Sequence, residues 1–156
     1  GVSVRLCETR LGLNPSLAGI KHLNRLEQVL ARAEWNDSSI QEGIMLDIND
    51  NVIEGTMTNL FYIKQNHLYT ASLRLTGIAG VIRSIILKIA SDYALQAKEH
   101  SYQIDELLMA DEVFVCNSII GIWPINRIVD KSFPVGPITK KIQQWIEKLS
   151  NQAIQK

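Results

Sequence analysis

Short blocks of apolar residues along the chain alternate between the spacing of strands and the spacing of helices. Residues 2–9 alternate apolar and polar side chains as a strand does. From Leu23 to about Glu34 apolar residues recur every three or four positions, which predicts a helix with one buried side. Lys21 precedes this pattern, so we expect it at the junction where the chain enters the helix.

The middle of the chain has the pattern of strands joined by tight turns. The predicted strands cover residues 43–48, 52–55, 59–64 and 67–71, with turns at 49–51 and 65–66. Glu54 therefore falls within a strand. The next segment, LRLTGIAG at 73–80, is a glycine-containing loop that leads into helical periodicity over 81–95. Such a loop at the start of a helix can bind an anion.

The last third of the chain combines both kinds of element. Its pattern predicts a strand at 97–103, a short helix at 104–110, a buried strand at 112–118 and an amphipathic helix at 138–149. The mixture of strands and helices indicates the α+β class. No repeat or linker interrupts residues 1–156, so we treat them as one domain. Because the first residues are already strand-like, we expect further protein upstream.

Composition narrows the range of partners. Sixteen basic residues balance sixteen acidic ones, which argues against nucleic acid or an acidic membrane and favours a small-molecule substrate. The apolar content of 46% is that of a soluble globular protein. No run approaches the roughly 18 apolar residues that cross a bilayer, and the first residues lack the pattern of a signal peptide. We therefore expect a cytoplasmic protein that has no membrane partner.

Cysteine, histidine and tryptophan residues offer no separate chemistry. Cys7 and Cys116 are the only cysteines, and the strand-like or apolar residues around them favour buried free thiols. The three histidines show no metal-ligand spacing, so we predict no metal site. The three tryptophans are dispersed, which favours core or interface packing over a platform for stacked bases.

Lys21 and Glu54 could carry chemistry if their surroundings are unusual. Most lysines are solvated, but Lys21 follows the apolar run LAGI, and a dry pocket would lower its pKa and free the amine to react with an aldehyde. A carboxylate in a strand usually faces solvent. The alternative for Glu54 is to face a pyridine nitrogen and keep it protonated. The residues alone leave both alternatives open.

Two further segments could bind a phosphate group. The amides of Ile78 and Ala79 lie in the loop before the predicted helix at 81–95, where the helix dipole favours an anion. Ordinary turn chemistry explains the loop equally well. Asn117 and Ser118 end a predicted strand, and they could add polar contacts or simply cap the turn that follows.

Four segments, in this order, resemble those of a known enzyme group. They are LAGIKHLNRLEQVLAR at 17–32, VIEGTMTNLF at 52–61, TGIAGVIR at 76–83 and ADEVFVCNS at 110–118. Together they resemble the fold-type IV pyridoxal-phosphate enzymes, which include branched-chain aminotransferases, D-amino-acid aminotransferases and aminodeoxychorismate lyases. The stretch RLGLNPSLAGIKHLNRLEQVLAR at 10–32 is most similar to the lyases.

The resemblance implies a fold and a cofactor. The fold would be the larger C-terminal domain of that group, a mixed sheet or pseudo-barrel with flanking helices, and the smaller N-terminal domain would lie outside this chain. Pyridoxal 5′-phosphate would be bound covalently by Lys21, with Glu54 against the ring nitrogen. The other implied cofactor contacts are the amides of Ile78 and Ala79 on the phosphate, with Asn59, Asn117 and Ser118 nearby.

The resemblance also implies an activity. A lyase of this group would convert 4-amino-4-deoxychorismate into 4-aminobenzoate and pyruvate, a step of folate biosynthesis, and would act as a homodimer. An aminotransferase of the same fold would use the same lysine, and residues 55–58 match the small-residue run of the aminotransferases only loosely. A non-catalytic binding or assembly domain is the alternative from another class. It would not form the covalent bond with the cofactor.

Overall fold

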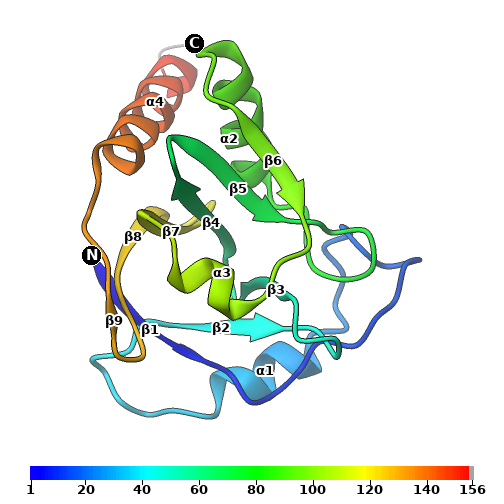
Figure 1. The fold of residues 1–156 in the computed structure, drawn as a ribbon. Helices are drawn as coiled ribbons and strands as arrows, with labels where there is room; N and C mark the ends of the chain where they lie inside the picture. Colours follow the sequence, from blue (N-terminus) through cyan, green and yellow to red (C-terminus); the bar gives the residue numbers. More distant parts are fainter. Residues whose placement is uncertain (155–156) are drawn as a thin grey trace.

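A mixed sheet forms the centre of the computed structural model, which describes residues 1–154 (Figure 1). Within that part of the chain the sheet has nine strands, and four helices accompany it. The elements are β1 (Val2–Leu6), α1 (Leu26–Arg32), β2 (Glu42–Leu46), β3 (Val52–Gly55), β4 (Asn59–Lys64), β5 (His67–Ala71), α2 (Val81–Asp92), β6 (Ala97–His100), α3 (Ile104–Leu108), β7 (Glu112–Asn117), β8 (Gly121–Ile128), β9 (Lys131–Ser132) and α4 (Pro137–Ile154).

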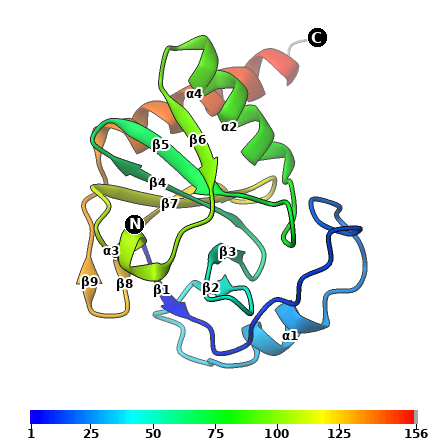
Figure 2. The ribbon, with the colours of Figure 1, turned by 45° about the vertical axis from the view of Figure 1, so that its right-hand side comes forward.

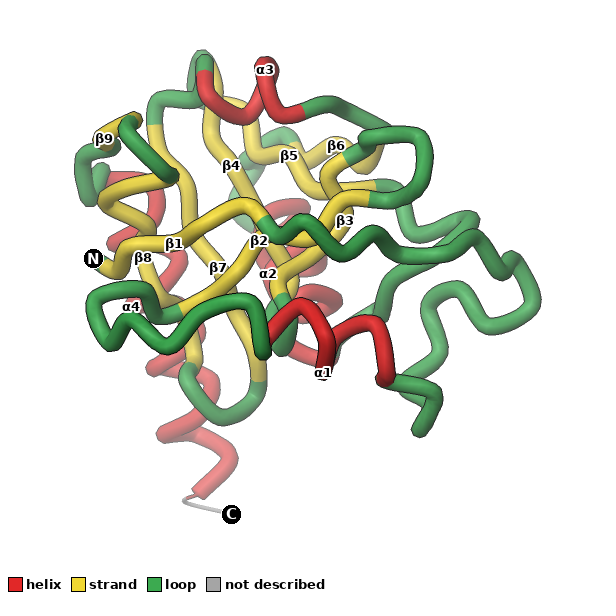
Figure 3. The backbone as a smooth tube through the Cα atoms, turned by 90° about the horizontal axis from the view of Figure 1, so that it is seen from below, coloured by secondary structure: helices red, strands yellow, loops and turns green. Residues whose placement is uncertain are grey.

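Six of the strands close into a barrel. Their order is β3-β2-β1-β8-β7-β4, and a pairing of Glu54 on β3 with Asn59 on β4 joins the two ends. Strand β1 runs parallel to both of its neighbours, whereas β7 is antiparallel to β4 and β8. Figure 3 shows these strands crossing one another when seen from below. The expected mixed sheet or pseudo-barrel with flanking helices, of the α+β class, is confirmed.

Apolar side chains fill the barrel and the layer beside it. One cluster of buried residues, which includes Val4, Ile44 and Leu60, lies among the barrel strands and under α3. A second cluster packs α2 and α4 against the outside of β4, β5 and β7, with Phe61 and Phe114 stacked at its centre. Figure 2 shows α2 and α4 lying together on this side of the sheet. The barrel strands therefore bury apolar side chains on both faces of the sheet, inside the barrel and under α2 and α4.

Most predicted strands occur at their predicted positions. Strands β3, β4 and β5 cover residues 52–55, 59–64 and 67–71 as expected. The turn between β4 and β5 has positive φ angles at Gln65 and Asn66, which is the geometry that a two-residue hairpin requires. Strand β8 had no counterpart in the sequence prediction. Its residues, GIWPINRI, include a glycine and a proline that disguise the strand.

Helix α1 differs from its prediction in length and in orientation. It covers seven residues rather than the span from Leu23 to Glu34, so Lys21 lies five residues before its start and not at the helix junction. The apolar side of this helix is exposed, with exposed fractions of 69% for Leu26, 61% for Val29 and 53% for Leu30. Helix α1 instead buries Gln28 and Ala31. The apolar residues have the predicted helical spacing, but the predicted burial of their side of the helix is wrong, because no other described residues cover it.

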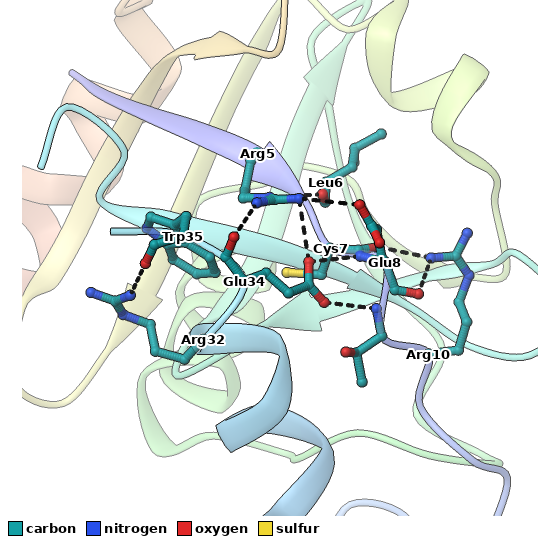
Figure 4. Close-up of polar contacts among 9 residues, drawn as sticks. Arg5, Leu6, Cys7, Glu8, Arg10, Arg32, Glu34 and Trp35 are labelled. Carbon is teal, nitrogen blue, oxygen red and sulfur yellow. Dashed lines mark hydrogen bonds and ion pairs between the residues drawn. The ribbon is translucent and has the colours of Figure 1, made fainter. Parts of the chain in front are cut away.

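Polar contacts fix the C-terminal end of α1 to the end of β1 (Figure 4). Glu34 accepts hydrogen bonds from the amides of Glu8 and Thr9 at 2.8 Å each, and its carboxylate lies 3.4 Å from the Arg5 guanidinium. Burial acts to raise the pKa of Glu34, but these two amides and Arg5 together lower it. Arg32 also packs over the ring of Trp35. Helix α1 is therefore anchored at one end although its apolar side is bare.

The expectations for cysteine and tryptophan agree with the structure. Cys7 and Cys116 are buried free thiols, and burial raises the pKa of each to about 12. Trp35 and Trp145 are buried, and Trp123 packs against the barrel core. None of the helices within residues 1–154 combines the length and apolar character needed to cross a membrane. Among the same residues, no group of three or more His, Cys, Asp or Glu side chains is placed to hold a metal ion.

Candidate active site

One cavity of about 420 Å³ brings all the predicted site residues together. It opens where β3, β4, the loop before α2 and the end of β7 meet. The predicted residues that line it are Lys21, Glu54, Asn59, Ile78, Ala79, Asn117 and Ser118. Larger hollows of about 610, 750 and 640 Å³ occur elsewhere, but none of them contains Lys21 or Glu54. The smaller cavity is therefore the candidate site.

Lys21 reaches this cavity from an irregular segment rather than from a helix. A backbone bridge pairs Gly19 with Ile78, and the hydrogen bonds at this bridge tie the segment to the loop that precedes α2. The side chain of Lys21 is exposed in the structure. We expected a sheltered amine, and the described residues do not supply that shelter, since they leave the side chain exposed. Lys21 does line the same cavity as Glu54.

Glu54 is the most deeply buried charged group of the cavity, with 2% of the residue exposed. Its Oε2 accepts a hydrogen bond of 2.8 Å from the amide of Ile78. Its Oε1 is buried and has no hydrogen-bond partner among the described residues, although Arg25 Nη1 lies 3.7 Å away. Burial raises the pKa of Glu54 to about 7, against the opposing influence of Ile78 and Arg25. The solvent-facing alternative for this carboxylate is excluded.

Asn59 fixes the loop before α2 to the barrel. Its Nδ2 donates to the carbonyl oxygen of Ile78 at 2.7 Å, and its Oδ1 accepts from the amide of Gly80 at 3.1 Å. A Cβ atom at Gly80 would collide with Oδ1 of Asn59, so only glycine allows this close approach. Asn59 therefore sets the position at which α2 begins.

The amides predicted to bind phosphate are already occupied. The amide of Ile78 donates to Glu54, and the amide of Ala79 donates to the carbonyl oxygen of Gly19 at 3.1 Å. The prediction that these two amides bind phosphate stays a prediction. The first turn of a helix has no intrahelical acceptors for its amides, and Val81 and Ile82 form that turn at the cavity wall. The start of α2 is therefore a second position in this cavity that could bind an anion.

Asn117 and Ser118 lie across the cavity, where β7 ends. Oδ1 of Asn117 accepts from the amides of Ile119 and Ile120 at 2.8 Å each, and its Nδ2 donates to the carbonyl oxygen of Met57 at 3.1 Å. Asn117 thus caps the turn after β7, the alternative that we left open. Ser118 is exposed beside it and lines the cavity, so its hydroxyl is available to a ligand.

Sequence reasoning missed Arg25, which lines the cavity together with Lys21 and Glu54 and forms an ion pair with Glu54. A possible signal was present, since Arg25 follows Lys21 by four residues within the segment of highest resemblance. Arg25 was not predicted as a site residue because the backbone from 20 to 25 is irregular, and apolar periodicity does not predict an irregular path. Val81 and Ile82 were not predicted because the glycines of the preceding loop are the stronger sequence signal for an anion site.

The comparisons with known proteins agree with this geometry. The model of the family described as amino-transferase class IV matches residues 2–128. The chain belongs to the aminotransferase class IV family. It is 40% identical to an aminodeoxychorismate lyase of Vibrio harveyi over 147 residues, which are 92% of this chain and 54% of that protein. It is 34% identical to a branched-chain-amino-acid aminotransferase of Escherichia coli K12 over 124 residues, 78% of this chain and 40% of that protein.

Solved structures of this aminotransferase class IV family share the fold. A 4-amino-4-deoxychorismate lyase of Pseudomonas aeruginosa superposes with a TM-score of 0.93 at 44% identity, over 95% of this chain and 55% of that one. The branched-chain aminotransferase of Escherichia coli superposes with a TM-score of 0.85 at 30% identity, over 92% of this chain and 50% of that one. The chain spans about half the length of the curated relatives it matches.

The cavity fits the cofactor that the family resemblance implies. A pyridinium N–H is a donor, and the buried Oε1 of Glu54 is an acceptor that lacks one. A phosphate needs several hydrogen-bond donors, and the amides at the start of α2 and the Ser118 hydroxyl line the same cavity. An aldehyde needs a primary amine, which Lys21 brings to the cavity. The three chemical groups of pyridoxal phosphate thus each have a matching residue.

Proposed function

We propose that this chain forms the cofactor-binding part of a lyase that converts 4-amino-4-deoxychorismate into 4-aminobenzoate and pyruvate. The observation that carries the proposal is the cavity that Lys21 and Glu54 line together, in which the buried Oε1 of Glu54 lacks a hydrogen-bond partner. The relatives support the lyase over the aminotransferase, because identity is higher and covers more of the chain for the lyase of Vibrio harveyi than for the aminotransferase of Escherichia coli.

Pyridoxal phosphate, when bound, supplies an aldehyde that captures the substrate amine and a ring that accepts electrons from it. Lys21 would hold the cofactor through that aldehyde, and Glu54 would keep the ring nitrogen protonated. The amides of Val81 and Ile82, with Ser118, would hold the phosphate. Asn59 contributes indirectly, since it fixes the start of α2 where those amides lie.

Lys21 would have a second task as the acid–base group of the reaction. Its amine, when free, would take the proton from the substrate ring carbon that bears the amino group. The enolpyruvyl ether bond breaks as the substrate ring becomes aromatic, and Lys21 returns a proton to the methylene carbon of the leaving group, which gives pyruvate. Orientation of the ether bond and stabilisation of the negative charge are the main contributions of the protein.

An aminotransferase is the second candidate, and it rests on the branched-chain relatives. It would use Lys21 for the same covalent bond, but it would move the amino group to a 2-oxo acid instead of releasing pyruvate. A non-catalytic module is the third candidate, and the exposed side chain of Lys21 is compatible with it. The unpartnered buried oxygen of Glu54 argues against this module, because burial of such an oxygen costs roughly 1–3 kcal/mol without a ligand.

The product of the reaction distinguishes these candidates. Full-length protein loaded with pyridoxal phosphate and given 4-amino-4-deoxychorismate should release pyruvate, which lactate dehydrogenase and NADH detect by absorbance, and 4-aminobenzoate in equal amount. A parallel reaction with leucine and 2-oxoglutarate should form glutamate at least 100-fold more slowly. Faster glutamate formation than pyruvate release would reverse the assignment, and a colourless protein with neither product would favour the non-catalytic module.

We also propose that the protein is a homodimer, as the family resemblance implies. The exposed apolar side of α1, made up of Leu26, Val29 and Leu30, supports this, because such stripes are normally covered in a stable protein. Light scattering of the full-length protein should give twice the chain mass. A double substitution of Leu26 and Val29 by glutamate should shift it to the mass of one chain. A wild-type protein with the mass of a single chain would contradict the proposal.

A further inference from the structure

We propose that Arg25 is a positioning residue of the cofactor site, whose guanidinium holds Glu54 as an anion facing the ring nitrogen of bound pyridoxal phosphate. This role rests on the proposed function. Arg25 would lie near the ring-nitrogen end of the cofactor, away from the reacting amine of Lys21. It would act through Glu54 and would not contact the substrate.

The geometry around Arg25 is specific to Glu54. Arg25 stands at the N-terminal end of α1, and its side chain makes no cap for that helix. Instead Nη1 lies 3.7 Å from Oε1 of Glu54, and Nη2 donates to the carbonyl oxygen of Thr56 at 3.4 Å. The side chain is 24% exposed, whereas that of Glu54 is 2% exposed. The cation therefore keeps part of its hydration while it neutralises a carboxylate that has almost none.

Glu54 needs such a cation because its other surroundings favour the neutral acid. Burial raises its pKa to about 7, and a second buried carboxylate, Glu42, acts in the same direction. Glu42 is itself fixed by hydrogen bonds from the backbone amides and hydroxyls of the loop at 55–58, so it cannot move away. The amide of Ile78, the guanidinium of Arg25 and the side-chain amide of Gln28 oppose both effects. Of these three groups, only Arg25 carries a full charge.

The ionisation of Glu54 decides where a proton lies when a pyridine nitrogen meets its free Oε1. An anionic carboxylate attracts the proton onto the ring nitrogen, and the positive ring then accepts electrons from the substrate. A neutral carboxylic acid keeps its proton and leaves the ring a weaker electron acceptor. The Arg25 guanidinium lies next to the Glu54 carboxylate, and a ring bound on the other side of that carboxylate would be farther from the guanidinium. The attraction between Arg25 and an anionic Glu54 therefore exceeds the repulsion between Arg25 and a protonated ring, which favours the anionic carboxylate.

A titration of cofactor-free protein tests the ion pair without any activity measurement. In full-length protein carrying ¹³C-labelled glutamate carboxyls, the Glu54 signal, assigned by its loss in Glu54→Gln, reports the ionisation of that group. In Arg25→Gln the midpoint should move to higher pH by about one unit. Arg25→Lys should move it less, because it keeps the charge. Arg32→Gln, on the same helix but packed on Trp35, should leave it unchanged.

A double-mutant cycle on cofactor affinity tests whether Arg25 acts through Glu54. Arg25→Gln should raise the Kd for pyridoxal phosphate roughly tenfold, because the expected change of one unit in the titration midpoint of Glu54 corresponds to a factor of ten in an equilibrium constant. In the Glu54→Gln background the same substitution should have little further effect. Equal weakening in both backgrounds would overturn the proposal, since Arg25 would then contact the cofactor itself. An unmoved Glu54 midpoint in Arg25→Gln would overturn it as well.

Failure of the proposed function can be recognised separately. A wild-type protein that shows no absorbance band of a lysine-bound cofactor would overturn the proposed function, and the role of Arg25 with it. If wild-type protein shows the band but the Glu54 midpoint does not move in Arg25→Gln, only the role of Arg25 is overturned. Circular dichroism of each variant confirms that the comparison is made between folded proteins.

Discussion

Replacing Lys21 by alanine should abolish turnover and remove the absorbance band of the lysine-bound cofactor in the full-length protein. Lys21 supplies both the covalent attachment and the acid–base group, and its cavity contains no second lysine among the described residues. The loss of rate should be on the order of 10⁴-fold or more, because two functions of one residue are removed together. Pyruvate release and an absorbance scan are the measurements.

Lys88→Ala is the matched control for this substitution. Lys88 is exposed on α2, outside the cavity, so its removal should leave both the rate and the absorbance band unchanged. Full activity in Lys21→Ala would refute the assignment of Lys21. A loss of activity in Lys21→Ala with the absorbance band retained would mean that another amine holds the cofactor.

Replacing Glu54 by glutamine should weaken catalysis without removing the covalent attachment. Glutamine is similar in size but carries no charge, so the ring nitrogen would lose the anion that keeps it protonated. We expect the rate of pyruvate release to fall roughly 100-fold, as when one preorganised electrostatic contact is lost. The absorbance band should persist. Glu54→Asp, which keeps the charge on a shorter side chain, is the comparison, and equal rates in Glu54→Gln and wild type would contradict the role.

The same substitution should stabilise the cofactor-free protein at alkaline pH. The pKa of Glu54 is raised by burial from 4.5 to about 7, so the folded state binds a proton that the unfolded chain releases between these values. Stability therefore falls as pH rises through this window, by an amount on the order of 3 kcal/mol. Glu54→Gln does not titrate. Its melting temperature should exceed that of wild type at pH 8, and the difference should shrink at pH 5.

The hairpin of β4 and β5 was predictable because its chemistry is local. The turn residues between β4 and β5, and the apolar runs on either side, define that hairpin without reference to the rest of the fold. Strand β8 was not predictable on the same basis. Its Pro124 pairs with Phe114 on β7, and only this tertiary contact makes a strand of a segment that local rules assign to a loop.

The cavity was predictable only through the resemblance. Sequence patterns place Lys21, Glu54 and the loop before α2 on separate elements, and nothing local brings them together. The bridge of Gly19 to Ile78 and the hydrogen bond from the Ile78 amide to Glu54 do so in three dimensions. The partners of the Ile78 and Ala79 amides were not predictable from the sequence, because the acceptors, Glu54 and the carbonyl oxygen of Gly19, lie on distant segments of the chain.

The exposed apolar side of α1 shows a different limit of sequence reasoning. Periodicity identifies an apolar face, but it does not say what covers that face. Leu26 and Val29 have the spacing of core residues, yet the core of the described residues lies on the opposite side of the helix, under Ala31. The same segment leads from Lys21 to Arg25, so whatever covers this face also lies close to the candidate site.

The central claim is that Lys21 is the residue that holds the cofactor, and a chemical label tests it most directly. Full-length protein is incubated with pyridoxal phosphate and reduced with borohydride, which makes the attachment permanent, and its peptides are then mapped by mass spectrometry. We predict a phosphopyridoxyl group on Lys21, in the peptide that contains LAGIKHLNR, at close to one per chain. A label on another lysine, or labelling spread thinly over many exposed lysines, would contradict the account.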